Sequence, residues 1–79
     1  MTTKRFLPVS GNEMVRIFLN VGCKVERKRG SHIILSRGDE LLVIPDHDQI
    51  AKGTGRELIK DAGLTVEAFN ILLNGKKQR

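Results

Sequence analysis

The chain has 79 residues, and its 14 Lys and Arg against nine Asp and Glu give a net charge of +5. This length predicts one domain over residues 1–79 with a basic, frayed tail at residues 75–79. No apolar run approaches the roughly 20 residues of a membrane span, and no signal-like apolar core follows the first residues. The single Cys23 excludes an internal disulfide and indicates a reducing compartment, so we expect a cytoplasmic protein.

The positive charge favours nucleic acid or an acidic protein as a partner. Ordinary solubility charge also explains an excess of this size. The chain has no Trp or Tyr, and its three phenylalanines, Phe6, Phe18 and Phe69, are expected in packing. Base stacking on an aromatic platform, as single-strand binders use it, is therefore not expected.

Residues 11–21 are predicted to form an amphipathic helix. Ser10 and Glu13 have the S-x-x-E spacing of a capping box at its start. Apolar residues recur on one face at helical spacing, at Met14, Ile17, Phe18 and Val21. Gly22 follows where a helix commonly ends in a left-handed residue.

The pattern then changes to strands. Residues 25–35 predict one strand, residues 36–40 a turn and residues 41–44 a further strand, which pairs with the first as an antiparallel hairpin. The sheet is expected to hold two or three strands.

Alternation sorts the side chains of the first strand onto two faces. One face is predicted to carry Lys28, Gly30, His32 and Ile34, and the other Arg29, Ser31, Ile33 and Leu35. The face that ends in Ile33 and Leu35 is the more apolar of the two. We therefore expect that face to lie against the core and His32 to face outward. A bulge near Gly30 would reverse this assignment.

Two more helices are predicted near residues 54–62 and 65–73. Thr54 and Glu57 have capping-box spacing, Thr65 is placed to cap the last helix, and Asn74-Gly75 is expected to close it. This order predicts an α+β fold, a small two-layer sandwich in which helices pack on an antiparallel sheet of about three strands. It is also the layout of double-stranded-RNA-binding domains, and it leaves one sheet face open for a partner.

The basic stretch before the apolar strand combines the groups that phosphate chemistry needs. Lys28 and Arg29 supply charge, Gly30 permits close approach of the backbone, and His32 can move protons near neutral pH. Ser31 either orients the phosphate or the imidazole or is a plain small residue. If the phosphate belongs to RNA, the neighbouring 2′-hydroxyl is a nucleophile already present, so its cleavage would need no metal and no cofactor, and we expect none. A basic edge strand with an exposed histidine explains the same residues.

Two further clusters carry polar side chains. Arg56 and Lys60 share a face of a predicted helix whose N-terminus favours phosphate, so they either bind the RNA backbone or form a solvated basic face. His47 is a candidate second proton-transfer group or a loop histidine that hydrogen-bonds locally. Its neighbours Asp46 and Asp48 suggest a metal site, but side chains two apart in one loop rarely converge, so none is expected.

Three motifs in order make the chain resemble the HicA (YcfA-like) toxin family. They are Gly30-Ser31-His32, Ile44-Pro45-Asp46-His47, and Gly53-Thr54-x-Arg56 followed by Ile59-Lys60 and Ala62-Gly63-Leu64. The resemblance covers residues 9–73. It implies a double-stranded-RNA-binding-domain-like fold, a ribonuclease toxin that cleaves messenger RNA, and a HicB antitoxin as partner. The family's catalytic histidine falls on His32, and Gly30 and Ser31 complete that motif.

One position departs from the family pattern. Gly55 stands where the family has an apolar residue after Gly-Thr, which adds a flexible residue to the start of the helix.

Three function classes are compatible with these residues. The first is a small endoribonuclease toxin that uses His32. The second is an RNA- or DNA-binding module without catalysis, and the third is an interaction domain whose basic face meets an acidic protein. A histidine fixed beside a glycine favours the first class, because a binding module does not need one.

Overall fold

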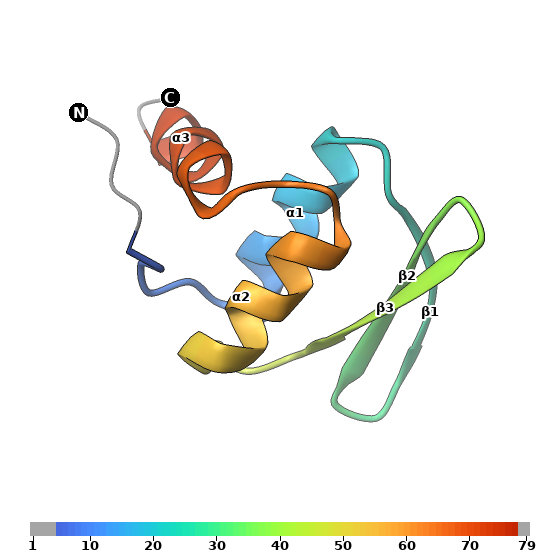
Figure 1. Cartoon of the computed structure of the whole chain (residues 1–79). Coiled ribbons are helices and arrows are strands. Elements are labelled where there is room, and N and C mark those ends of the chain that lie inside the picture. The colour runs from blue at the N-terminus through green and yellow to red at the C-terminus, as the bar shows by residue number, and fades with distance from the viewer. Residues whose placement is uncertain (1–4, 78–79) are drawn as a thin grey trace.

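The computed structural model describes residues 5–77, which form three helices and three strands (Figure 1). In chain order the elements are α1 (Gly11–Asn20), β1 (Lys24–Arg29), β2 (His32–Arg37), β3 (Glu40–Pro45), α2 (Lys52–Asp61) and α3 (Val66–Lys77). The strands form one antiparallel sheet in the order β1-β2-β3. The predicted α+β class is confirmed, and the order fits the layout of a double-stranded-RNA-binding domain. Among the described residues, no helix is long and apolar enough to cross a membrane.

Helix α1 begins with the predicted capping box. The Ser10 hydroxyl accepts the Glu13 N–H at 3.1 Å, and the Glu13 carboxylate accepts the Ser10 N–H at 3.0 Å. Gly11 donates its N–H to the His47 carbonyl at 2.9 Å, and a Cβ at Gly11 would meet the Pro45 carbonyl oxygen. A glycine at the start of α1 therefore lets the helix pack directly against the segment that follows β3.

The prediction of one strand over residues 25–35 is wrong, because the chain reverses in its middle. Arg29 pairs with His32, which leaves Gly30 and Ser31 as a two-residue turn between β1 and β2. Gly30 has φ +56°, a backbone conformation that glycine adopts without steric cost at the first central position of a hairpin turn. The turn predicted at residues 36–40 is shorter in the structure: only Gly38 and Asp39 form the second hairpin turn, between β2 and β3, because Ser36, Arg37 and Glu40 pair within the sheet.

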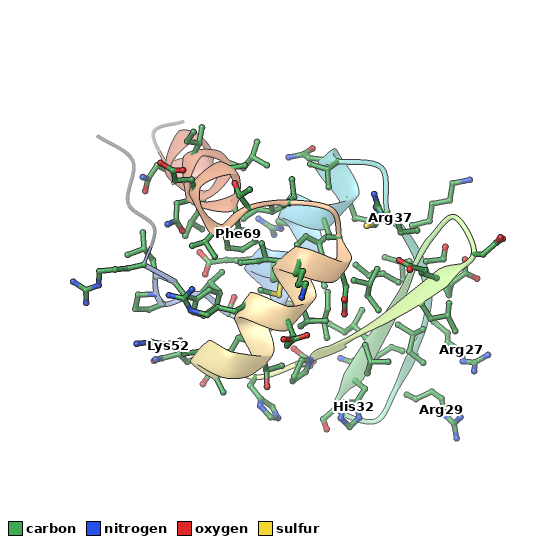
Figure 2. The ribbon with its side chains drawn as sticks, in the orientation of Figure 1. Arg27, Arg29, His32, Arg37, Lys52 and Phe69 are labelled. Carbon is green, nitrogen blue, oxygen red and sulfur yellow. The ribbon has the colours of Figure 1, made fainter. Side chains whose placement is uncertain are left out.

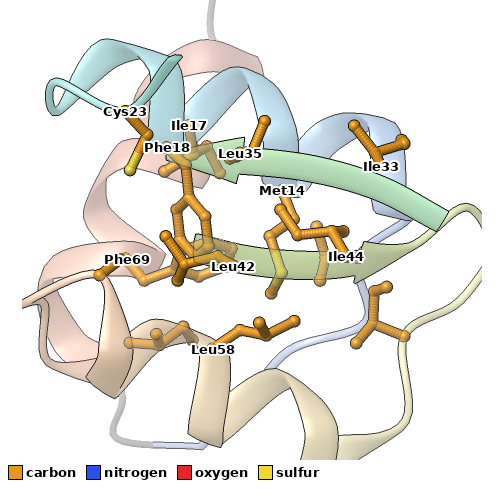
Figure 3. Close-up of a cluster of buried hydrophobic side chains, with 14 of the residues drawn as sticks. Met14, Ile17, Phe18, Cys23, Ile33, Leu35, Leu42, Ile44, Leu58 and Phe69 are labelled. Carbon is orange, nitrogen blue, oxygen red and sulfur yellow. The ribbon is translucent and has the colours of Figure 1, made fainter. Parts of the chain in front are cut away.

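The core lies between the sheet and the helices (Figure 3). Alternate residues of β2 and β3 are buried on the inner face, namely Ile33, Leu35, Leu42 and Ile44. Helices α1 and α2 contact this sheet, and α3 packs against both of them (Figure 1). Phe18 and Phe69 meet edge to face at 6.0 Å between ring centroids, so aromatic contacts join α1 to α3. The prediction that Ile33 and Leu35 face the core is confirmed.

Cys23 is part of this core. Burial raises the pKa of its thiol, while the charge of Arg37 acts in the opposite direction. The side chain therefore serves as a small apolar filler.

The ends of α2 and α3 differ from the predictions. Helix α2 begins at Lys52 with Ala51 as its N-cap and no side-chain cap, so the predicted capping box at Thr54 is wrong. The cap of α3 is confirmed, since the Thr65 hydroxyl accepts the Ala68 N–H at 3.0 Å. The predicted end at residues 74–75 is wrong, because Gly75 does not adopt a positive φ and α3 continues to Lys77. Residues 78–79 of the predicted tail lie outside the described residues.

The aromatic ring of Phe6 explains why α2 carries a glycine at position 55. Gly55 is buried, and a Cβ built on it would collide with the Phe6 ring. That ring is itself buried and stacks on Phe69 with 6.4 Å between centroids. The N-terminal segment thus supplies the apolar group that the helix lacks at this position.

Replacing Gly55 by alanine is expected to destabilise the protein by about 1–3 kcal/mol, the usual cost of overpacking a core. The matched control is Gly53→Ala in the same helical turn, where an added Cβ meets nothing within 4 Å. We expect Gly53→Ala to be neutral or stabilising, since alanine is the better helix former. Urea denaturation of both variants measures the difference. An equal effect of the two substitutions would contradict the packing of Phe6 on α2.

Candidate functional site

His32 is the first residue of β2 and lies on the outer face of the sheet, away from the helices. It is exposed, whereas the next residue, Ile33, is buried on the inner face. In the antiparallel register His32 lies opposite Arg29 of β1 and opposite Pro45 of β3. Residues directly opposite each other share a face, so Arg29 is the cationic neighbour of His32 on this surface.

A second row of side chains lies beside the first on the outer face. Ile34 is opposite Arg27 of β1 and opposite Val43 of β3. Ile34 is half-buried, while Val43 is 47% exposed. The outer face near His32 therefore carries cations along β1 and branched apolar side chains along β2 and β3. Figure 2 shows Arg27, Arg29 and His32 together at the strand end of the molecule.

A β-bulge in β1 makes this arrangement possible. The register shifts between Val25 and Arg27, which leaves Glu26 as the extra residue. Val25 lies opposite the buried Leu35, on the face toward the helices, whereas Arg27 lies on the outer face. Without the bulge, residues two apart would share a face. The carboxylate of Glu26 accepts a hydrogen bond from the Ser36 hydroxyl at 2.6 Å, which joins the bulge to β2.

The predicted assignment of Lys28 and Arg29 to faces is wrong for both residues. Lys28 lies opposite the buried Ile33 rather than beside His32. Its Nζ contacts Asp46 Oδ2 at 2.8 Å, so its charge is already paired. The reason is the two-residue turn, which places Arg29 opposite His32 and thereby exchanges the faces predicted for a continuous strand.

Gly30 and Ser31 form the turn that positions His32. The Asp46 N–H donates to the Ser31 carbonyl at 2.8 Å, which ties the turn to the segment after β3. A Cβ at Gly30 would meet nothing within 4 Å, so the space beside His32 is open. A shallow hollow, open to solvent, occupies this region and is lined by Arg29, Gly30, His32, Ile34 and Val43.

The structure does not bring the other predicted basic residues to this hollow. Arg56 and Lys60 are exposed on α2, in the helical layer rather than on the outer sheet face. Figure 2 shows Lys52, at the start of the same helix, to the left of His32 and apart from it. Arg56 and Lys60 therefore form a surface separate from the one that carries His32.

The loop candidates have structural roles. Asp46 pairs with Lys28, and the backbone carbonyl of His47 holds the start of α1. Within residues 5–77, no group of three or more His, Cys, Asp or Glu side chains is arranged to hold a metal ion. Sequence reasoning did not identify Val43 as part of the hollow or Asp46 as the residue that ties the turn. A Gly-Ser dipeptide between two β-rich runs is the signal that locates the turn and hence the register.

The fold and the site together define a small α+β protein with a histidine and two arginines on an open sheet face. Residues 11–64, well over half of the chain, match the family model described as the HicA toxin of bacterial toxin-antitoxin systems. The chain therefore belongs to the HicA toxin family of bacterial toxin-antitoxin systems. A comparison with curated proteins found no match.

Proposed function

We propose that this toxin is an endoribonuclease that cleaves messenger RNA in the cytoplasm, with His32 as its general acid and base. Membership of the HicA family supports a toxin role. The observation that carries the proposal is the register of β1 and β2, which sets Arg29 directly opposite His32. A proton-transfer group and a cation thus share one open surface.

The chemistry follows from the RNA itself. His32 removes the proton of the 2′-hydroxyl, whose oxygen attacks the adjacent phosphorus. The bond between phosphorus and the 5′-oxygen breaks, and the leaving oxygen takes the proton that His32 removed from the 2′-hydroxyl. Arg27 and Arg29 stabilise the extra negative charge that develops on the phosphate oxygens. The products are a 2′,3′-cyclic phosphate, or the 3′-phosphate formed from it by hydrolysis, and a 5′-hydroxyl.

This proposal is tested with the wild-type protein and an RNA oligonucleotide in EDTA. A matched oligonucleotide carries a 2′-deoxynucleotide at the cleaved position. We expect cleavage of the first and none of the second at that position, with cyclic phosphate and 5′-hydroxyl ends. Cleavage of the deoxy position, or products with a 5′-phosphate, would overturn the mechanism. Binding without any cleavage would favour the alternative, a non-catalytic RNA-binding module.

Arg56 and Lys60 are proposed to contact the RNA backbone from the separate surface on α2. Because that surface lies in the helical layer, only a long RNA would span both regions. Arg56→Ala with Lys60→Ala is expected to weaken binding of a long RNA severalfold and to leave the affinity for a short oligonucleotide unchanged. Titrations with RNAs of both lengths measure this. An equal loss for short and long RNA would instead place both residues at the His32 surface.

The antitoxin, which we propose to be HicB-like, is expected to cover the outer face that carries His32. A rigid partner over this face excludes RNA directly, without a conformational change in the toxin. The purified complex should therefore cleave RNA at a small fraction of the rate of the free toxin. A complex that retains the full rate would show that the antitoxin binds elsewhere.

A further inference from the structure

The hollow beside His32 has two chemically different sides. One side carries Arg29 and the imidazole of His32, next to the open space at Gly30. The other side is apolar and consists of Ile34 and Val43. A half-buried isoleucine and an exposed valine lie beside a proton-transfer group and a cation. This arrangement is suited to a ligand that is charged at one end and flat and weakly polar at the other.

We propose that this hollow receives the base of the nucleotide whose 2′-hydroxyl His32 deprotonates, with Ile34 and Val43 as its floor. The inference rests on the proposed ribonuclease function and names how that site holds its substrate. The 2′-hydroxyl and the base are attached to the same ribose. A ribose that lies at His32 therefore carries its base to the adjacent surface, and the apolar part of that surface is formed by Ile34 and Val43.

The spacing across the sheet supports a nucleotide as the occupant. Neighbouring strands lie about 4.8 Å apart, so the distance from β1 to β3 is roughly 10 Å, the scale of one nucleotide measured across phosphate and base. The phosphate lies at the arginines of β1, while the base crosses β2 toward Val43. Aliphatic side chains replace here the aromatic rings on which many single-strand binders stack bases.

The apolar floor formed by Ile34 and Val43 also predicts which bases the hollow prefers. β2 is the central strand and pairs with both of its neighbours, so its backbone groups are used within the sheet. The side chains of Ile34 and Val43 carry no hydrogen-bonding atoms. This apolar floor therefore favours a base through contact area rather than through the pattern of donors and acceptors on its edge, and larger purines are expected to be preferred over pyrimidines.

The test uses oligonucleotides that contain a single ribonucleotide in a 2′-deoxy strand, so that one phosphate is cleavable. One version carries adenine on that ribose and the other is abasic. We expect the kcat/KM of the wild type to be about tenfold higher for the adenine version than for the abasic version. This ratio is near the lower end of the effect measured when a base loses an aromatic stacking partner. In Val43→Ala this ratio is expected to fall to about threefold. Equal cleavage of both versions by the wild type would overturn the inference without any variant being needed.

Leu41→Ala is the matched control. Leu41 lies on the same strand and the same face as Val43, is 64% exposed and is outside the hollow. This variant should retain the full tenfold ratio, and a ratio in Val43→Ala equal to that in Leu41→Ala would contradict the assignment of Val43. Because Val43 is 47% exposed, its truncation leaves no cavity in the core, and the alanine variant is expected to fold.

Failure of the proposed function gives a different result. If the wild type cleaves neither version, the ribonuclease assignment is wrong. The base pocket is then tested separately, by comparing the affinities for two fully 2′-deoxy strands, one with adenine and one with an abasic site. Tighter binding of the adenine strand that disappears in Val43→Ala would support the pocket. Equal affinities would overturn it.

Discussion

Replacing His32 by alanine is expected to lower the rate of RNA cleavage about 10²–10⁴-fold, the usual effect of removing a general acid or base. The fold should be unaffected, because His32 is exposed on the outer face and its truncation leaves no cavity in the core. RNA affinity should change little, since Arg27 and Arg29 remain in place. Single-turnover cleavage, circular dichroism and RNA titration on one preparation measure the three properties.

His47→Ala is the matched control for this variant. His47 is also exposed, and it holds α1 through its backbone carbonyl, which the substitution retains. We expect His47→Ala to cleave RNA at nearly the wild-type rate. A large loss of activity in His47→Ala would show instead that the two histidines share the proton transfers.

Removing both Arg27 and Arg29 is expected to weaken RNA binding about 100-fold, since hydrogen bonds to charged groups contribute about 1.5–3 kcal/mol each. The dependence of affinity on salt should also become shallower, by about 0.7–0.9 for each phosphate that the variant no longer neutralises. Titrations of the double alanine variant at several salt concentrations measure both effects.

Lys28→Ala is the control that shows whether RNA affinity depends on the position of the arginines or only on the number of positive charges. Lys28 lies between the two arginines in the sequence, but it faces the other way and pairs with Asp46 at 2.8 Å. Removing the Lys28 side chain should lower RNA affinity by less than about threefold. This is the effect expected from the loss of one exposed ion pair and one positive charge. A decrease as large as that of Arg29→Ala would contradict the register of β1.

Local signals in the sequence predicted the elements that depend on neighbours along the chain. The capping box of Ser10 and Glu13 located the start of α1, and the Thr65 cap located α3. The hairpin turn at Gly30-Ser31 was missed because branched and basic residues continue on both sides of it. A missed turn exchanges the faces of a strand, which is why Lys28 and Arg29 were assigned to the wrong sides.

The start of α2 shows where local signals fail. Thr54 and Glu57 have the spacing of a cap, but α2 begins two residues earlier. Ile50 is buried and donates its N–H to the Val9 carbonyl at 2.9 Å, and Gly55 makes room for Phe6. These contacts come from the distant N-terminal segment, and tertiary packing of this kind overrides a local preference.

In the candidate site, too, some features follow from local sequence and others from contacts between distant segments. The outward position of His32 and the close approach that Gly30 permits beside it follow from residues close in sequence, and both were predicted. The residues of the other two strands that line the hollow with His32, Arg29 and Val43, depend on a tight turn, a bulge and a second hairpin. Their place beside His32 is a property of the register and is not visible in any one segment.

The most direct test of the central claim is the single-turnover cleavage rate of His32→Ala in EDTA as a function of added imidazole. The hollow beside His32 is open to solvent, so free imidazole can enter the space that the side chain leaves. We predict almost no cleavage without imidazole and a rate that rises with its concentration, because the small molecule supplies the missing proton-transfer group. Cleavage at the wild-type rate without imidazole, by a folded variant that binds RNA, would contradict the assignment of His32 as the catalyst.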